Sequence, residues 1–243
     1  MGCLKTKKTM KNLLTVLFVM LMAMLLVSCD TEDPGPLQEE TKEYSIIDFD
    51  QLEMGSGFNI RVEEASTFKV RVEGDRRNIN DLDVFKSGTS LIIRYDENSE
   101  RHHQTFITVE MPSLRKINFS GGSVSVISGF ESDEELDIIL LGGSICQLDA
   151  GYKSIDLSVS GGSVMKLHGL GDELKADISG ASTLSAFDYP VGRADVVLTG
   201  ASDAKLTVSD ELRVNASGAS RVSYRGNPQV EETSTGGSVV GRD

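Results

Sequence analysis

The fold is decided by the stretch Ile155-Asp156-Leu157-Ser158-Val159-Ser160-Gly161-Gly162-Ser163-Val164-Met165-Lys166-Leu167. At its centre stands a four-residue Gly-Ser motif, in which Gly-Gly or Gly-Ala precedes a serine. The motif occurs seven times, at 120–123, 141–144, 160–163, 179–182, 199–202, 217–220 and 235–238. Its first glycines follow one another at steps of 21, 19, 19, 20, 18 and 18 residues. Repetition at a short period predicts stacked units, each burying its apolar face only against its neighbours.

Apolar and polar residues alternate strictly on both sides of the motif. In the third repeat the apolar positions are Ile155, Leu157 and Val159 before the glycines, and Met165 and Leu167 after them. This period of two indicates strands with one buried face. Strand, tight turn and strand in each repeat predict an all-β fold, a right-handed parallel β-helix (solenoid) of about seven coils. A left-handed hexapeptide helix would fit a period of eighteen, but the chain has no six-residue apolar rhythm.

The serine at the end of each motif has the same parity as the apolar positions. We therefore expect these serines to stack inside the coils or at a corner, as a structural ladder: Ser123, Ser144, Ser163, Ser182, Ser202, Ser220 and Ser238. A nucleophilic serine needs a base within reach, and no histidine accompanies these seven. No catalytic residue is predicted among them.

Residues 1–28 have the pattern of an export signal. Lysines at 5, 7, 8 and 11 precede an apolar run over 13–27, and Leu26-Val27-Ser28-Cys29 resembles a bacterial lipobox. The expectation is a lipoprotein acylated at Cys29, which the lipid attaches to the outer membrane, at the cell surface or on its periplasmic face. Residues 29–43 are acidic and are expected to be a flexible tether.

The charge of the remaining chain is strongly negative. Of 24 basic residues, the leader holds four, which leaves 20 against 37 acidic residues and a net charge of −17. This disfavours nucleic acid and anionic membrane surfaces as partners. It is compatible with a divalent cation such as calcium, although no cofactor is required.

Residues 44–243 are expected to form a single domain. Its regular coils cover 112–243, and the strand-rich segment 44–111 supplies opening coils and a cap; a separate small β-domain over 44–111 is the alternative. The last motif lies close to residue 243, so residues 226–243 must cap the end, or a partner must cover it. Self-association through this C-terminal edge is one such arrangement.

Few side chains suggest chemistry. Asp137 and Asp156 occupy the same outward position of adjacent repeats, so stacking would place them close enough to share a cation. A solvated stripe, in which Asp156 and Lys175 pair, is the simpler interpretation. Cys146 is at an inward position and is expected to be a small apolar filler. The adjacent histidines 102 and 103 could bind a metal, and His168 is expected to point outward alone.

Residues 45–240 resemble the putative auto-transporter adhesin, head GIN domain family. The resemblance rests on Gly57-Phe58-Asn59 at the naming motif, on the strands near 70–75 and 91–93, and on the Gly-Ser motifs in series. It implies an exported bacterial solenoid and a role in adhesion, without established catalytic residues. We therefore expect a non-catalytic lipoprotein that binds a glycan or a protein at the cell surface. The alternatives are a polysaccharide lyase or hydrolase, with Asp137 and Asp156 as its carboxylates, and a structural envelope protein.

Overall fold

A computed structural model describes residues 35–96 and 101–243 of the chain. The predicted leader 1–28 and the predicted lipidation site Cys29 lie outside these residues. Leu37–Asp243 form one compact unit. Its buried hydrophobic residues form one continuous core, which runs from Phe49 to Val222. Within the described residues, no helix has the length and apolarity needed to cross a membrane.

The unit is almost entirely β-structure. Its elements are β1 (Glu39–Tyr44), β2 (Gln51–Met54), β3 (Asn59–Glu64), β4 (Lys69–Asp75), α2 (Arg76–Asn80), β5 (Leu82–Ser87), β6 (Ser90–Tyr95), β7 (Phe106–Met111), β8 (Lys116–Phe119), β9 (Val124–Leu140), β10 (Ile145–Val159), β11 (Val164–Leu170), β12 (Glu173–Ile178), β13 (Thr183–Leu198), β14 (Asp203–Ala216), β15 (Arg221–Arg225), β16 (Gln229–Ser234) and β17 (Val239–Arg242).

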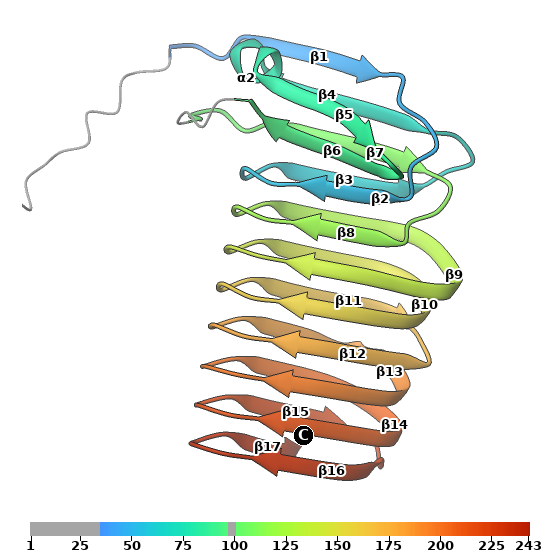
Figure 1. Ribbon diagram of the computed structural model, residues 1–243, viewed down its shortest axis with the longest axis vertical. Coiled ribbons are helices and arrows are strands. Elements are labelled where there is room, and N and C mark those ends of the chain that lie inside the picture. The colour runs from blue at the N-terminus through green and yellow to red at the C-terminus, as the bar shows by residue number, and fades with distance from the viewer. Residues whose placement is uncertain (1–34, 97–100) are drawn as a thin grey trace, which may run out of the picture. The chain divides into compact units, whose positions relative to one another are not determined.

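Each coil consists of two strands that face one another across a narrow core (Figure 1). Strands that precede the Gly-Ser motif form the upstream sheet, and strands that follow it form the downstream sheet. In the regular coils both sheets are parallel, with partners one coil apart: Ile155 pairs with Leu136, and Met165 pairs with Cys146. The long strands β9, β10, β13 and β14 bend from the downstream sheet of one coil into the upstream sheet of the next, with register shifts at the bend. The predicted β-solenoid is thereby confirmed.

The tight turns have two conformations, and the sequence distinguishes them. In the first three Gly-Gly motifs both glycines have positive φ; in the third, Gly161 is at 70° and Gly162 at 79°. From Gly180 onward only the first glycine has positive φ, which lets alanine take the second place. In that turn the backbone amide of the residue after the glycine donates a hydrogen bond to the preceding coil. Ala219 N, for example, donates to the Gly200 carbonyl at 2.7 Å. Alanine therefore occurs only where the second φ no longer requires glycine.

The N-terminal end is capped by antiparallel strands and a short helix. β1 pairs with β4 and β4 pairs with β7, both antiparallel, while β5 and β6 form a hairpin. α2 begins after its N-cap Asp75, and its Ile79 is fully buried. The predicted tether over 29–43 is therefore wrong from Glu39 onward. Residues 39–43 lie in β1, because β4 offers them a pairing edge that the local sequence does not reveal.

The opening coils are not stacked in chain order. The coil β2–β3 lies between the strands β6 and β7 on one side and β8 and β9 on the other (Figure 1). The chain therefore enters at the second coil, builds the cap and β6–β7 beyond it, and returns through 112–115 to β8. The segment 44–111 thus contributes both coils and a cap, with the coils out of chain order.

Residues 226–243 form the last coil that the structure describes. They contain β16 and β17, which pair in parallel with β14 and β15 and complete one more coil. The last Gly-Ser motif forms the turn of this coil. Its serine, Ser238, is half-buried, because no coil covers it within the described residues.

Candidate functional site

The serine ladder occupies the corner of the coils and is satisfied by backbone groups. Six of the seven serines are buried, with Ser238 the exception. Ser163 shows the pattern: its Oγ donates to the Ser160 carbonyl at 2.7 Å and accepts from the Ser144 amide at 3.2 Å. 

The Ser163 amide donates in turn to the Ser182 Oγ at 3.2 Å. Hydroxyls committed to turn carbonyls hold the coil geometry, and they are not poised for nucleophilic attack.

The two predicted carboxylates lie side by side on the outside of the upstream sheet. Asp156 pairs in register with Asp137, and the same column continues to Lys116 on one side and Lys175 on the other. Lys116 Nζ contacts Asp137 Oδ2 at 2.5 Å, so this carboxylate already has a cationic partner. Farther along, the column continues with Asp195, Arg213 and Glu231. The described residues contain no group of three or more His, Cys, Asp or Glu side chains placed to hold a metal ion.

Cys146 is buried in the core, and His103 and His168 each lie near a carboxylate. Cys146 is fully buried in the downstream sheet, and burial raises the pKa of its thiol to about 12. His103 Nε2 lies 3.9 Å from a carboxylate oxygen of the buried Asp75, beside the N-terminal cap. His168 was expected to point outward alone, but it has a partner: its Nδ1 lies 3.7 Å from Asp188 Oδ2. The register of β11 with β13 places Asp188 next to it, which no local pattern indicates.

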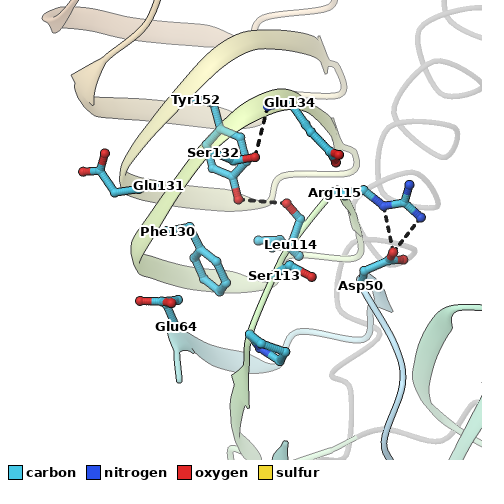
Figure 2. Close-up of a pocket in the computed structure, with 11 residues that line it drawn as sticks. Asp50, Glu64, Ser113, Leu114, Arg115, Phe130, Glu131, Ser132, Glu134 and Tyr152 are labelled. Carbon is cyan, nitrogen blue, oxygen red and sulfur yellow. Dashed lines mark hydrogen bonds and ion pairs between the residues drawn. The ribbon is translucent and has the colours of Figure 1, made fainter. Parts of the chain in front are cut away.

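A hollow of about 450 Å³ opens at the bend side of the coils, opposite the Gly-Ser turns. It lies between the segment 112–115 and the bends of β9 and β10 (Figure 2). Tyr152 forms part of its wall and donates its hydroxyl proton to the Leu114 carbonyl at 2.8 Å. Burial raises the pKa of this tyrosine above its ordinary range. The residue is therefore a neutral structural brace between two coils.

The polar groups of this hollow do not converge on one point. Figure 2 shows Glu64 and Glu131 on one side of Phe130, and Glu134 on the other. Arg115 is engaged by Asp50, with Nη2 2.6 Å from the Asp50 Oδ2. A second hollow of about 350 Å³ adjoins the first and shares Glu131, Ser132 and Tyr152 with it. Together they form an acidic depression that suits water and cations better than an acidic ligand.

The downstream sheet carries an exposed aliphatic patch, which the sequence analysis missed. Its members are Val124, Val126 and Ile145, whose exposed fractions are 43%, 36% and 41%. Val124 and Ile145 are register partners on adjacent coils, and the half-buried Val164 continues their column. Farther along the same column the residues become polar, with Thr183 followed by an aspartate and an arginine. Apolar residues at outward positions were the available signal, because they break the alternation.

Comparison with known proteins agrees with the architecture. A family model, described as putative auto-transporter adhesin, head GIN domain, matches residues 48–228. The chain belongs to this family. None of the curated proteins compared with the chain matches it.

Several solved structures share the fold at low sequence identity. The crystal structure of a putative adhesin from Bacteroides fragilis is 17% identical, with a TM-score of 0.75, and the match covers 84% of this chain and 96% of that one. A putative adhesin from Parabacteroides merdae is 16% identical, with a TM-score of 0.68 and coverage of 85% and 96%. A structure described as a putative lipid binding protein, from Parabacteroides distasonis, is 16% identical, with a TM-score of 0.70 and coverage of 84% and 96%.

The segment at the family's naming motif forms a turn of the same kind as the Gly-Gly turns. Ser56 and Gly57 both have positive φ, at 61° and 71°, like Gly121 and Gly122 in the next coil. Phe58 then takes the place that serine holds in the other coils, since its carbonyl accepts from Val124 N just as the Ser123 carbonyl accepts from the next coil. The motif thus forms the first Gly-Ser-type turn along the chain, and in it the buried phenyl ring of Phe58 replaces the serine hydroxyl.

Proposed function

We propose that this protein is a non-catalytic binding module of the adhesin type, which holds a partner protein on its aliphatic patch at the bacterial cell surface. The observation that carries the proposal is the cluster of Val124, Val126 and Ile145, all exposed on two neighbouring coils of the downstream sheet. A contiguous exposed apolar cluster rimmed by polar residues marks an interaction surface in soluble proteins. Membership of an adhesin family supports the same function.

The chemistry of the patch favours a protein over a glycan. Branched aliphatic side chains on a flat sheet complement the apolar centre of a protein interface. Sugar rings are commonly held by aromatic faces, and the members of the patch are all aliphatic. The exposed Phe106 lies in the same outward column, but Asn59 separates it from Val124. The excess of acidic residues favours a partner with basic groups around its contact surface. Glycan binding at the acidic depression is the second candidate, because it offers hydroxyl and carboxylate groups in a hollow large enough for a sugar.

The attachment to the membrane is a further part of the proposal. The lipobox-like segment ending at Cys29 supports acylation of that cysteine and anchoring in the outer membrane. Radiolabelled palmitate added to growing cells would label the wild-type protein, and Cys29→Ala would abolish the label. Incorporation that persists in Cys29→Ala would contradict this anchoring site.

The function is tested by an array of extracellular-matrix proteins, serum proteins and glycans. Residues 35–243 serve as the soluble probe, since they include the whole compact unit. Saturable binding to a protein, unchanged by removal of calcium, is the expected result. Binding to glycans alone would replace the proposed partner, and a requirement for calcium would direct attention to Asp137 and Asp156. Release of reducing ends from a polysaccharide by the same preparation would contradict the non-catalytic assignment.

A further inference from the structure

The last coil leaves a sheet edge open at the C-terminal end of the unit. Within the described residues, β16 pairs only with β14, and β17 pairs only with β15. The outer sides of both strands therefore present unpaired N–H and C=O groups. Such an edge is a template for the strand of another coil or of another molecule, and stable proteins protect it.

Three inward positions of this coil differ from those of the coil beneath it. By register, Glu232 stands over Val214, Ser234 over Ala216, and Arg242 over Tyr224. Every regular coil before it has apolar residues at these three positions. The other two inward positions stay apolar, with Val230 over Leu212 and Val240 over Val222. One charge has therefore entered the core-facing side of each sheet.

The register places Glu232 and Ser234 on the lumen side of β16, where both residues are exposed. The Ser234 hydroxyl donates to the Glu232 carboxylate, which is consistent with both residues lying on the same side of β16. Val214, which lies beneath Glu232, is only 4% exposed, so the last coil covers the coil below it. The aliphatic part of a long charged side chain can cover apolar surface while its charged end stays in water. Another coil stacked on this edge would bury Glu232 and Arg242, at a large cost in desolvation.

We propose that β16 and β17 form a polar end coil, which stops the solenoid and prevents a second copy of this chain from stacking on it. Glu232, Ser234 and Arg242 are the residues that prevent stacking. The N-terminal end is protected by a different arrangement, in which α2 packs on the cap and the edge strand β1 carries charged residues. The inference does not depend on the proposed adhesive function.

The test converts the end coil into an ordinary one. The inward variant Glu232→Val/Ser234→Ala/Arg242→Tyr gives this coil the residues of the coil beneath it. Sedimentation equilibrium of residues 35–243, from micromolar to millimolar concentration, is expected to show a monomeric wild type. The inward variant is expected to show a doubling of molar mass as concentration rises. A variant that stays monomeric, with an unchanged circular dichroism spectrum, would overturn the proposal.

A matched control separates inward charge from total charge. Glu231 and Thr233 lie on the same strand but at outward positions, and Glu231 is 79% exposed at its side chain. The outward variant Glu231→Val/Thr233→Ala is expected to stay monomeric. If the triple inward variant fails to fold, Glu232→Val is compared with Glu231→Val, and only the former should dimerise. Equal association of the two, or wild-type dimers cross-linked through β16 or β17, would refute the end-coil role.

Discussion

Replacing Gly218 with alanine tests the packing of the tight turns most severely. Gly218 is the first glycine of its motif, with φ at 78°, and a Cβ at this position would lie 2.5 Å from the Gly200 carbonyl oxygen. The obstructing atom is backbone, so it cannot be relieved by rotation of a side chain. The same carbonyl accepts the Ala219 amide at 2.7 Å, and relief of the clash would disturb that hydrogen bond.

The expected loss has two parts. A non-glycine residue in the left-handed region costs about 1–2 kcal/mol. Disturbance of the hydrogen bond between coils adds roughly 1 kcal/mol. Gly218→Ala should therefore lower the free energy of unfolding by about 2–3 kcal/mol, which for a domain of this size corresponds to a fall in Tm of about 4–12 °C.

Gly143 is the matched control for this substitution. Its φ is also 78°, but a Cβ there would meet nothing within 4 Å. It is the second glycine of its motif, and it has positive φ, unlike the alanines at the equivalent position of three later repeats. Gly143→Ala should therefore lose only the conformational part, about 1–2 kcal/mol. Urea unfolding followed by circular dichroism would measure both variants, and equal losses would refute the argument from coil contact.

Three further predictions test other parts of the structure. Ser163→Ala removes a donor to the Ser160 carbonyl and an acceptor for the Ser144 amide, so urea unfolding should show a loss of about 1–3 kcal/mol, whereas the outward Ser158→Ala should change little. Cys146 should resist a thiol reagent at pH 8 in the folded protein, because it is buried and its pKa is raised to about 12; labelling in native buffer as fast as in urea would contradict this. Hydrogen bonds from Arg77 lower the pKa of the Asp75 carboxyl, so Asp75 stabilises the fold above the ordinary carboxyl pKa near 4, and this stability is lost as the pH falls below that value. Asp75→Asn should flatten the acid side of the stability curve in urea unfolding at several pH values, and the exposed Asp133→Asn should leave that side unchanged.

The repeats could be predicted because every coil has the same pattern of alternating apolar and polar residues around its Gly-Ser motif. Alternation fixed which face of each strand is buried, and the parity of the motif serine placed it at the corner with the core residues. The column of Asp137 and Asp156 followed from the same spacing, because equivalent residues of consecutive coils become register partners. These inferences need only the local sequence and the assumption that equivalent positions of consecutive repeats stack on one another.

The opening of the solenoid could not be predicted in the same way. The strands β2, β3, β6 and β7 all alternate in the same manner, and nothing in that pattern says which of them pairs with β8. β1 has the sequence Glu-Glu-Thr-Lys-Glu-Tyr, which is typical of a solvated linker, and only its pairing with β4 makes it a strand. The contact between His168 and Asp188 likewise depends on a register shift in the bend.

The aliphatic patch was visible in the sequence but had no place in the expected pattern. Val124, Ile145 and Val164 each follow the motif serine directly, at an outward position. A valine or an isoleucine is ordinary in a strand, so each residue alone carries no signal. Only the stacking of adjacent coils gathers them on one surface.

The most direct test of the adhesive surface compares two variants that each introduce two lysines on the downstream sheet. Val126→Lys/Ile145→Lys changes the aliphatic patch, and Thr183→Lys/Ser185→Lys adds the same charge at the equivalent columns of a later coil. Affinity for the protein ligand identified on the array would be measured for both by surface plasmon resonance. We expect the patch variant to lose binding by at least tenfold and the control to keep it. Equal affinity of the two variants would show that the partner is not held on the patch.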